Sequence, residues 1–190
     1  MMILLIDMVD LGVAQACLGN VLWWVFGKIG GVITREEEAM QQIMTYLKDA
    51  ANDLGHEMPV SKLKLTHIRG TDLRPRLKAK AARTRRLVPI ALRMLSMHFV
   101  PESEQESRIF KRLEYLNTAY QELEHWTPTS AVRLEEAVRR HCLLYLSLAR
   151  ESQQHDDRFL LWRWYPKHHM VLHLAGEQAH TMGNPASWWC

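Results

Sequence analysis

Hydrophobic residues recur along much of this chain at the spacing of an α-helix. A capping box, Thr34-Arg-Glu-Glu37, is followed by an apolar residue at every third or fourth position through residues 38–54. A second box, Ser103-Glu-Gln-Glu106, precedes the same pattern over residues 107–126, and residues 130–148 repeat it after a short break. Because the break is short, the last two helices are expected to pack as an antiparallel hairpin.

Other stretches predict different elements. Residues 62–68 alternate polar with apolar positions, which favours a short strand or an extended segment, and residues 159–164 are a second strand candidate. Pro75 is suited to open a helix, Pro89 is expected to kink it or to begin a new one, and a last helix is predicted over residues 167–182. The whole pattern predicts a mainly α fold, an irregular helical bundle of about five to six helices with one or two short strands.

The composition is that of a globular protein. With 190 residues, 47% of them hydrophobic and 24% charged, the chain fits a single helical domain over residues 1–190 and is not expected to be disordered. Cys17, Cys142 and Cys190 are odd in number and far apart, which argues against a disulfide framework and favours a reducing, intracellular compartment. The chain contains no glycine-rich phosphate loop and no Gly-x-Ser-x-Gly motif.

Both ends of the chain are apolar. It opens on Met1-Met-Ile-Leu-Leu-Ile6 and closes on Trp188-Trp-Cys190. Bulky apolar side chains at a terminus have few neighbours to pack against, so we expect the chain to be an internal piece of a larger protein. Where such ends are exposed, self-association through them is expected.

Residues 11–27 are uncharged, but they do not predict a membrane span. The stretch is shorter than the about 20 apolar residues that a spanning helix needs, and it contains Gln15 and Asn20. A signal peptide would carry positive charge just before it, where this chain has Asp7 and Asp10. We therefore predict a buried helix capped by Asp10 and no membrane partner.

Charge is distributed unevenly along the chain. Residues 62–93 hold eleven basic residues and one acidic residue, whereas the remainder of the chain is net acidic. Cations on one side of a helix neutralise phosphates without reading base sequence, so this basic window predicts contact with DNA. The residues predicted to make that contact are Arg74, Arg76, Lys78, Lys80, Arg83, Arg85 and Arg86.

One alternative involves no nucleic acid. The acids of residues 102–124 would balance the basic window inside the fold, as in a helical protein-interaction or scaffold domain. The acids available for such pairing are Glu104, Glu106, Glu114, Glu122 and Glu124. The sequence leaves both interpretations open, and ion pairs between these acids and the basic helix would favour the scaffold.

A second alternative is a metal-binding protein. His169, His173 and Glu177 follow one another at intervals of four, which stacks them on one face of the last helix. The His-Glu-x-x-His order of zinc proteases is absent, and no Cys-x-x-Cys pair completes a structural site. We therefore expect no metal site and no cofactor, with these three residues as weak candidates.

Short motifs lie near both ends of the chain. Asp10-Leu-Gly-Val-Ala-Gln-Ala-Cys-Leu-Gly-Asn-Val-Leu22 is one, and Pro166-Lys-His-His-Met-Val-Leu-His-Leu174 with Gly183-Asn-Pro185 and Trp188-Trp-Cys190 is the other. They resemble stretches of CACTA-type transposases and related mobile-element proteins, and residues 77–89 are similar in position to a basic helix of that family. The resemblance implies part of an RNase H-like catalytic domain with a large helical insertion, acidic residues that hold two metal ions, and a nuclear location.

The chain departs from that family where the catalytic acids would lie. Asp7 stands where the family has a histidine, Leu4 stands where it has an acid, and the final glutamate would follow Cys190. Half a set of carboxylates cannot hold a pair of metal ions. We therefore predict a catalytically incompetent fragment of a mobile-element-derived, transposase-like protein, not expected to be an enzyme, with non-specific DNA contact through its basic helix.

Overall fold

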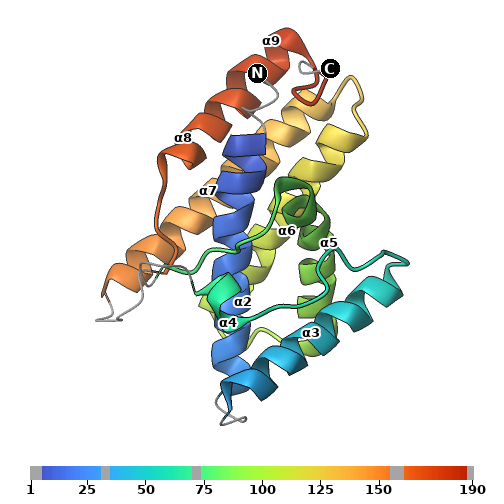
Figure 1. The fold of residues 1–190 in the computed structure, drawn as a ribbon. Helices are drawn as coiled ribbons and strands as arrows, with labels where there is room; N and C mark the ends of the chain where they lie inside the picture. Colours follow the sequence, from blue (N-terminus) through green and yellow to red (C-terminus); the bar gives the residue numbers. More distant parts are fainter. Residues whose placement is uncertain (1–5, 31–34, 70–73, 155–160, 188–190) are drawn as a thin grey trace.

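The protein is built almost entirely of helices in the computed structural model, which describes residues 6–30, 35–69, 74–154 and 161–187 (Figure 1). The elements are η1 (Ile6–Ala14), α2 (Gln15–Gly30), α3 (Glu36–Asp53), α4 (Leu65–Ile68), α5 (Ala81–His98), α6 (Glu104–Glu124), α7 (Ser130–Gln154), α8 (Pro166–His173), η2 (Leu174–Gln178) and α9 (Ala179–Met182). The label η marks π-helical turns; η1 runs directly into α2, and α8, η2 and α9 follow one another without a break. The prediction of a mainly α fold is confirmed.

The expected short strands do not occur in the described residues. Residues 62–64 have no regular secondary structure, with Lys64 in an extended conformation, and residues 65–68 form the short helix α4. Residues 161–164 form a turn and a loop, while residues 159–160 of that candidate lie outside the described ranges. The strand prediction for residues 62–68 was wrong. Leu63 is buried in the core while its lysine neighbours are exposed, and this produces the alternation of polar and apolar positions without pairing to another strand.

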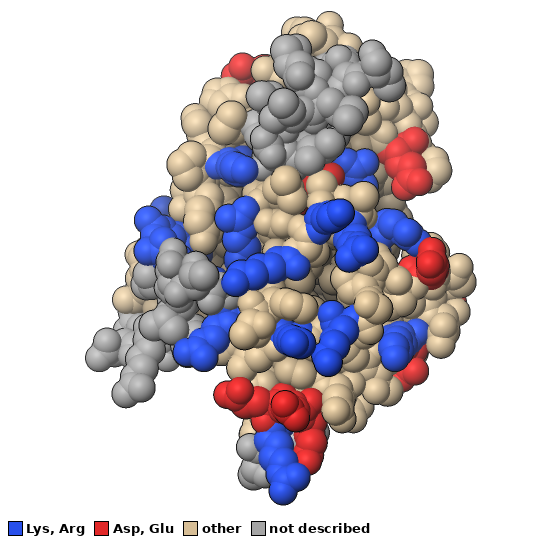
Figure 2. Space-filling view, in the orientation of Figure 1, with Lys and Arg blue, Asp and Glu red and all other residues tan. Residues whose placement is uncertain are grey.

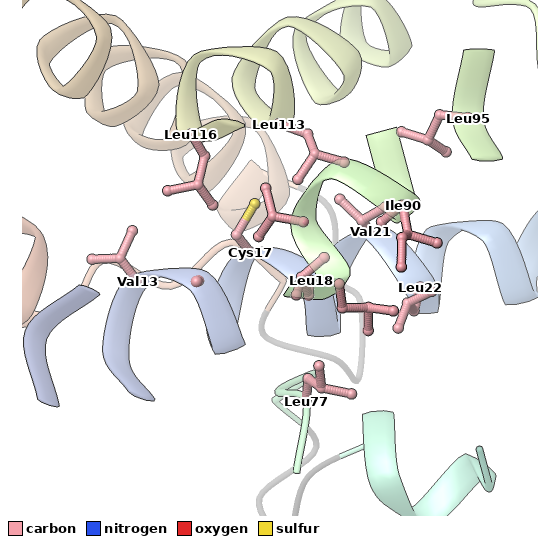
Figure 3. Close-up of a cluster of buried hydrophobic side chains, with 14 of the residues drawn as sticks. Val13, Cys17, Leu18, Val21, Leu22, Leu77, Ile90, Leu95, Leu113 and Leu116 are labelled. Carbon is pink, nitrogen blue, oxygen red and sulfur yellow. The ribbon is translucent and has the colours of Figure 1, made fainter. Parts of the chain in front are cut away.

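The continuous helix of η1 and α2 runs through the middle of the molecule (Figure 1). Its buried side chains Val13 and Leu18 lie in one hydrophobic cluster with Leu113 of α6 and Ile90 of α5 (Figure 3). The part from Val9 to Gly30 is long and apolar enough to cross a membrane by length and composition, and most of it is buried inside this fold. The predicted buried helix is therefore present as a core element.

The helices α6 and α7 form the antiparallel hairpin that the sequence predicts. Contacts across the hairpin run in opposite directions along the two helices, pairing Glu122 with Arg133, Tyr115 with Arg140 and Arg108 with Glu151. The hydroxyl of Ser103 accepts the N–H of Glu106 at 3.2 Å, as expected for the N-cap of α6. The first predicted capping box includes Thr34, which lies outside the described residues.

The helix predicted to open at Pro75 begins six residues later. Residues 74–80 are extended, and α5 starts at Ala81 and continues through Pro89 to His98. Proline permits a helix start at Pro75, but hydrogen bonds to α2 and α4 hold the following residues in an extended conformation, as described below.

The last helices are fixed to the core by His168. This side chain is fully buried, and its ring centroid lies 4.3 Å from that of Tyr145 in α7 and 4.8 Å from that of Trp164. The backbone N–H of Tyr165 donates to His168 Nδ1 at 3.2 Å. At the other end Gly183, with a φ of 78°, terminates α9 where the sequence predicted the helix to end.

Candidate nucleic-acid interface

The basic segment begins as an extended stretch that is hydrogen-bonded on both sides. The backbone N–H groups of Arg76 and Lys78 donate to carbonyls of α4 at 2.9 and 2.7 Å. The N–H of Leu77 points the other way and donates to the carbonyl of Gln15 at 3.0 Å. Successive side chains of an extended chain lie on opposite faces, so Leu77 enters the core while Arg76 and Lys78 stay exposed.

Three positions of the central helix receive this segment. The side-chain amides of Gln15 and Asn20 donate to backbone carbonyls of the segment, at 2.6 and 3.4 Å. Between them, Gly19 leaves room for the backbone of Arg76, because a Cβ at Gly19 would lie 2.4 Å from the Cα of Arg76. The polar and small residues that interrupt the apolar helix therefore determine where the basic segment lies.

Cationic side chains cover the outer side of this segment. Lys78 and Lys80 are exposed on the extended stretch, and Arg83 is exposed in the first turn of α5. Figure 2 shows Lys and Arg side chains gathered across the middle of this side of the molecule, with acidic side chains mainly at its lower end and right-hand rim. Within the described ranges, no ion pair involves Lys78, Lys80 or Arg83.

Two other predicted contact residues, Arg74 and Arg76, are less available, and a third, Arg86, has only a surface ion pair. Arg74 is half-buried. The guanidinium of Arg76 donates to Gln15 Oε1 at 3.0 Å and to a backbone carbonyl of η1. Arg86 lies 3.4 Å from a carboxylate oxygen of Glu57, but both side chains are exposed, and a pair of this kind contributes little to stability.

Arg85 is exposed on one side, but its guanidinium is held by a buried carboxylate of the core. Its Nη2 lies 2.9 Å from Oδ2 of Asp10, whose side chain is only 1% exposed. The Tyr120 hydroxyl of α6 donates to the other oxygen of Asp10 at 2.6 Å. Burial, followed by the neighbouring Asp10 carboxylate, raises the pKa of Tyr120 well above its usual value. Asp10 thus joins η1 to α5 and α6. The prediction that Asp10 caps the helix was wrong, because the helix already begins at Ile6.

Three acids of α6 have ion-pair partners outside residues 74–86. The ion pairs found are Glu104 with Arg108 at 2.7 Å, Glu106 with Lys28 at 2.5 Å and Glu122 with Arg133 at 2.7 Å. In the part of the chain that the structure describes, no ion pair joins Glu114, Glu124 or any other acid of α6 to residues 74–86. The pairing that would have favoured internal charge balance is therefore not observed there.

Three further cations of the basic window are exposed in the same region of the structure. Lys62 and Lys64 precede α4 and Arg69 follows it, and the carbonyls of α4 hold the extended segment. These three cations belong to the basic window of residues 62–93 but are not among the residues that the sequence predicted to contact DNA. We use the name basic face for the exposed cations Lys62, Lys64, Arg69, Lys78, Lys80, Arg83 and Arg86.

The metal-ligand candidates lie on α8 and η2. His169 and His173 are exposed, their Nε2 atoms are 3.1 Å apart, and His173 Nδ1 is 2.9 Å from Oε1 of Glu177. Among the described residues, no group of three or more His, Cys, Asp or Glu side chains is arranged to hold a metal ion. The side chain of Asp7, which stands where the transposase family has a histidine, is not among the described side chains.

Comparison of this chain with models of protein families, with curated proteins and with solved structures found no match. The resemblance to CACTA-type transposases therefore stays a prediction, as does the nuclear location that it implies. Part of that resemblance, and of the expected self-association through apolar ends, rests on residues 1–5 and 188–190, which lie outside the described ranges.

Proposed function

We propose that this chain binds DNA without sequence preference through its basic face. The observation that supports this proposal is the exposure of Lys78, Lys80 and Arg83, without an ion pair in the described ranges, on backbone that the fold holds in place. Lysine and arginine side chains in such positions attract phosphates, and binding releases the counterions condensed on the duplex. Contacts to phosphate position a protein on DNA but carry no sequence information directly.

The expected salt dependence follows from the number of cations. If about five side chains of the basic face each neutralise one phosphate, log K falls against log salt concentration with a slope of about −4 to −5. Such a steep dependence is the signature of polyanion binding and distinguishes it from a contact dominated by apolar surface.

A charge-reversal variant with a matched control tests the proposal. Fluorescence anisotropy of a labelled duplex would be followed over a salt series from about 50 to about 200 mM. The test variant combines Lys78→Glu, Lys80→Glu and Arg83→Glu. The control changes the net charge equally at exposed cations of α6 and α7, with Lys111→Glu, Arg139→Glu and Arg150→Glu.

We expect the test variant to lose at least about tenfold in affinity and to show a salt slope shallower by about 3, while the control loses much less. Circular dichroism would show that both variants keep the helical fold. Absence of binding by the unmodified chain at low salt, or equal losses in the two variants, would contradict the proposal.

A further inference from the structure

Two exposed histidines on α8 converge in a way that helix geometry alone does not require. His169 and His173 are one turn apart, and their ring planes are nearly perpendicular, with the centroids 4.5 Å apart. Their Nε2 atoms face each other at 3.1 Å. Both side chains are exposed, so neither is held in this arrangement by burial.

Glu177 determines which nitrogen of His173 is available. The carboxylate accepts a hydrogen bond from His173 Nδ1 at 2.9 Å. Since a carboxylate can only accept, the proton of the neutral ring lies on Nδ1, and Nε2 presents a lone pair. A carboxylate bound to the outer nitrogen of a histidine is the arrangement that orients metal-binding histidines and raises their basicity.

We propose that His169 and His173 form an exchangeable site for one divalent transition-metal ion, with Glu177 as the positioning residue. Imidazole nitrogens suit zinc, nickel and copper. Zinc–nitrogen bonds of about 2.0–2.1 Å at a tetrahedral angle place two nitrogens about 3.3 Å apart. Because His173 Nε2 is the acceptor, the 3.1 Å contact has Nε2–H of His169 as its donor, and on ion binding the exposed ring of His169 carries its proton on Nδ1 instead. The 3.1 Å between the two Nε2 atoms is close to the ligand separation, so the ion replaces this proton without rearrangement of the helix.

The π-helical turn η2 helps to explain why the carboxylate reaches the outer nitrogen. It begins at Leu174, directly after His173, and contains Glu177. A π-turn changes the angular spacing of the side chains that follow it, and such turns are frequent at functional sites. Glu177 therefore contacts Nδ1 of His173 and is not a third ligand beside the two Nε2 atoms.

The next histidine along the helix is committed elsewhere. His180 Nε2 lies 2.9 Å from a carboxylate oxygen of Glu135 in α7. With two protein ligands and no third candidate grouped with them in the described residues, water completes the coordination of the ion. The site is consequently open and exchangeable, unlike the closed four-ligand sites that hold structural zinc.

Calorimetric titration of the untagged full chain with zinc chloride near neutral pH tests this inference. We expect one zinc ion per chain, a loss of well over about tenfold in affinity for His169→Ala and for His173→Ala, and a smaller loss, of at most about tenfold, for Glu177→Gln. His125→Ala removes an exposed histidine from a different part of the surface and serves as the control. All four side chains are exposed, so circular dichroism should show unchanged folds.

The outcomes separate clearly. Zinc binding that is lost in both histidine variants and kept in the His125 variant supports the site. No zinc binding by the unmodified chain, or equal affinity in all variants, overturns it. If Glu177→Gln keeps full zinc affinity while both histidine variants lose it, Glu177 is not a positioning residue and the two histidines alone form the site.

Discussion

Acid should destabilise this fold through His168. The ring is fully buried between Tyr145 and Trp164, and its Nδ1 accepts a backbone hydrogen bond, so the folded state holds it neutral. Burial lowers the pKa of His168 from 6.5 to about 4. Between these two values the unfolded chain binds a proton that the folded chain does not, and stability therefore falls as the pH decreases.

The size of the effect follows from the two pKa values. The contribution of the neutral His168 ring to the free energy of unfolding is fully present above about pH 6.5, declines as the pH falls and has mostly disappeared near pH 4. The total loss of unfolding free energy over this interval is roughly 3 kcal/mol. Burial also lowers the pKa of His141 well below its usual value, so the pH dependence of the unmodified chain includes more than one group. The contribution of His168 to the pH dependence is therefore obtained as the difference between the unmodified chain and a variant that lacks this histidine.

Urea unfolding at a series of pH values, followed by circular dichroism, measures this difference. His168→Asn keeps an acceptor near the position of Nδ1 but cannot take up a proton in this range. We expect this variant to be less stable near pH 7 and to lose less stability than the unmodified chain between about pH 6.5 and 4. His125→Asn, at an exposed position, controls for the loss of one histidine. Identical pH dependence in the His168 variant and the unmodified chain would refute the reasoning.

Two further predictions concern the contacts that position the basic segment, and both are checked by urea unfolding. Gly19→Ala would place a Cβ 2.4 Å from the Cα of Arg76, and we expect a destabilisation of at least about 1–3 kcal/mol, whereas Gly27→Ala, with nothing within 4 Å of the added Cβ, should be neutral or stabilising. Similar losses in the two glycine variants would contradict the close approach. Tyr120→Phe removes the 2.6 Å hydrogen bond to the buried Asp10 and should cost about 1–3 kcal/mol, and an unchanged unfolding midpoint would contradict that role.

The sequence was a good guide where partners are close along the chain. The hairpin of α6 and α7 could be predicted because each helix shows its own apolar period and a short connection leaves few other ways to pack. The same holds for the end of α9 at Gly183, which needs only a local change of backbone conformation.

Distant partners explain the failures. Residues 75–80 carry no strong signal against a helix, yet hydrogen bonds to Gln15 and to α4 keep them extended. Asp10 precedes an uncharged run, as a cap would, but its carboxylate is bound by Arg85 and Tyr120, far along the sequence. Local propensity is a weak prior that such tertiary contacts override.

Arg112 in the core is another residue whose partners could not be predicted from the sequence. It lies on α6 with no exposed surface, and in the described residues no acid pairs with it. Its guanidinium lies 3.9 Å from the ring centroid of Trp162 and 3.4 Å from the carbonyl oxygen of Cys17. Stacking on an aromatic ring partly compensates the loss of water, but the sequence alone does not bring these residues together.

The same difference between local and distant partners applies to the residues of the predicted DNA interface. The alternation of Arg76, Leu77 and Lys78 could be related to exposure once the segment is known to be extended. Which cations serve the fold could not be predicted, because the roles of Arg76 and Arg85 depend on partners in η1 and α2.

The polar residues that argued against a membrane helix have a positive role in the fold. Gln15 and Asn20 interrupt the apolar pattern of the central helix, and both bind the backbone of the basic segment. Lys78 consequently projects from backbone that is fixed by the core and by α4 before any ligand arrives. A surface arranged in this way loses less conformational entropy on binding than a flexible basic tail with the same charge. Weakening these anchors should therefore reduce DNA affinity even when every cation of the basic face is kept.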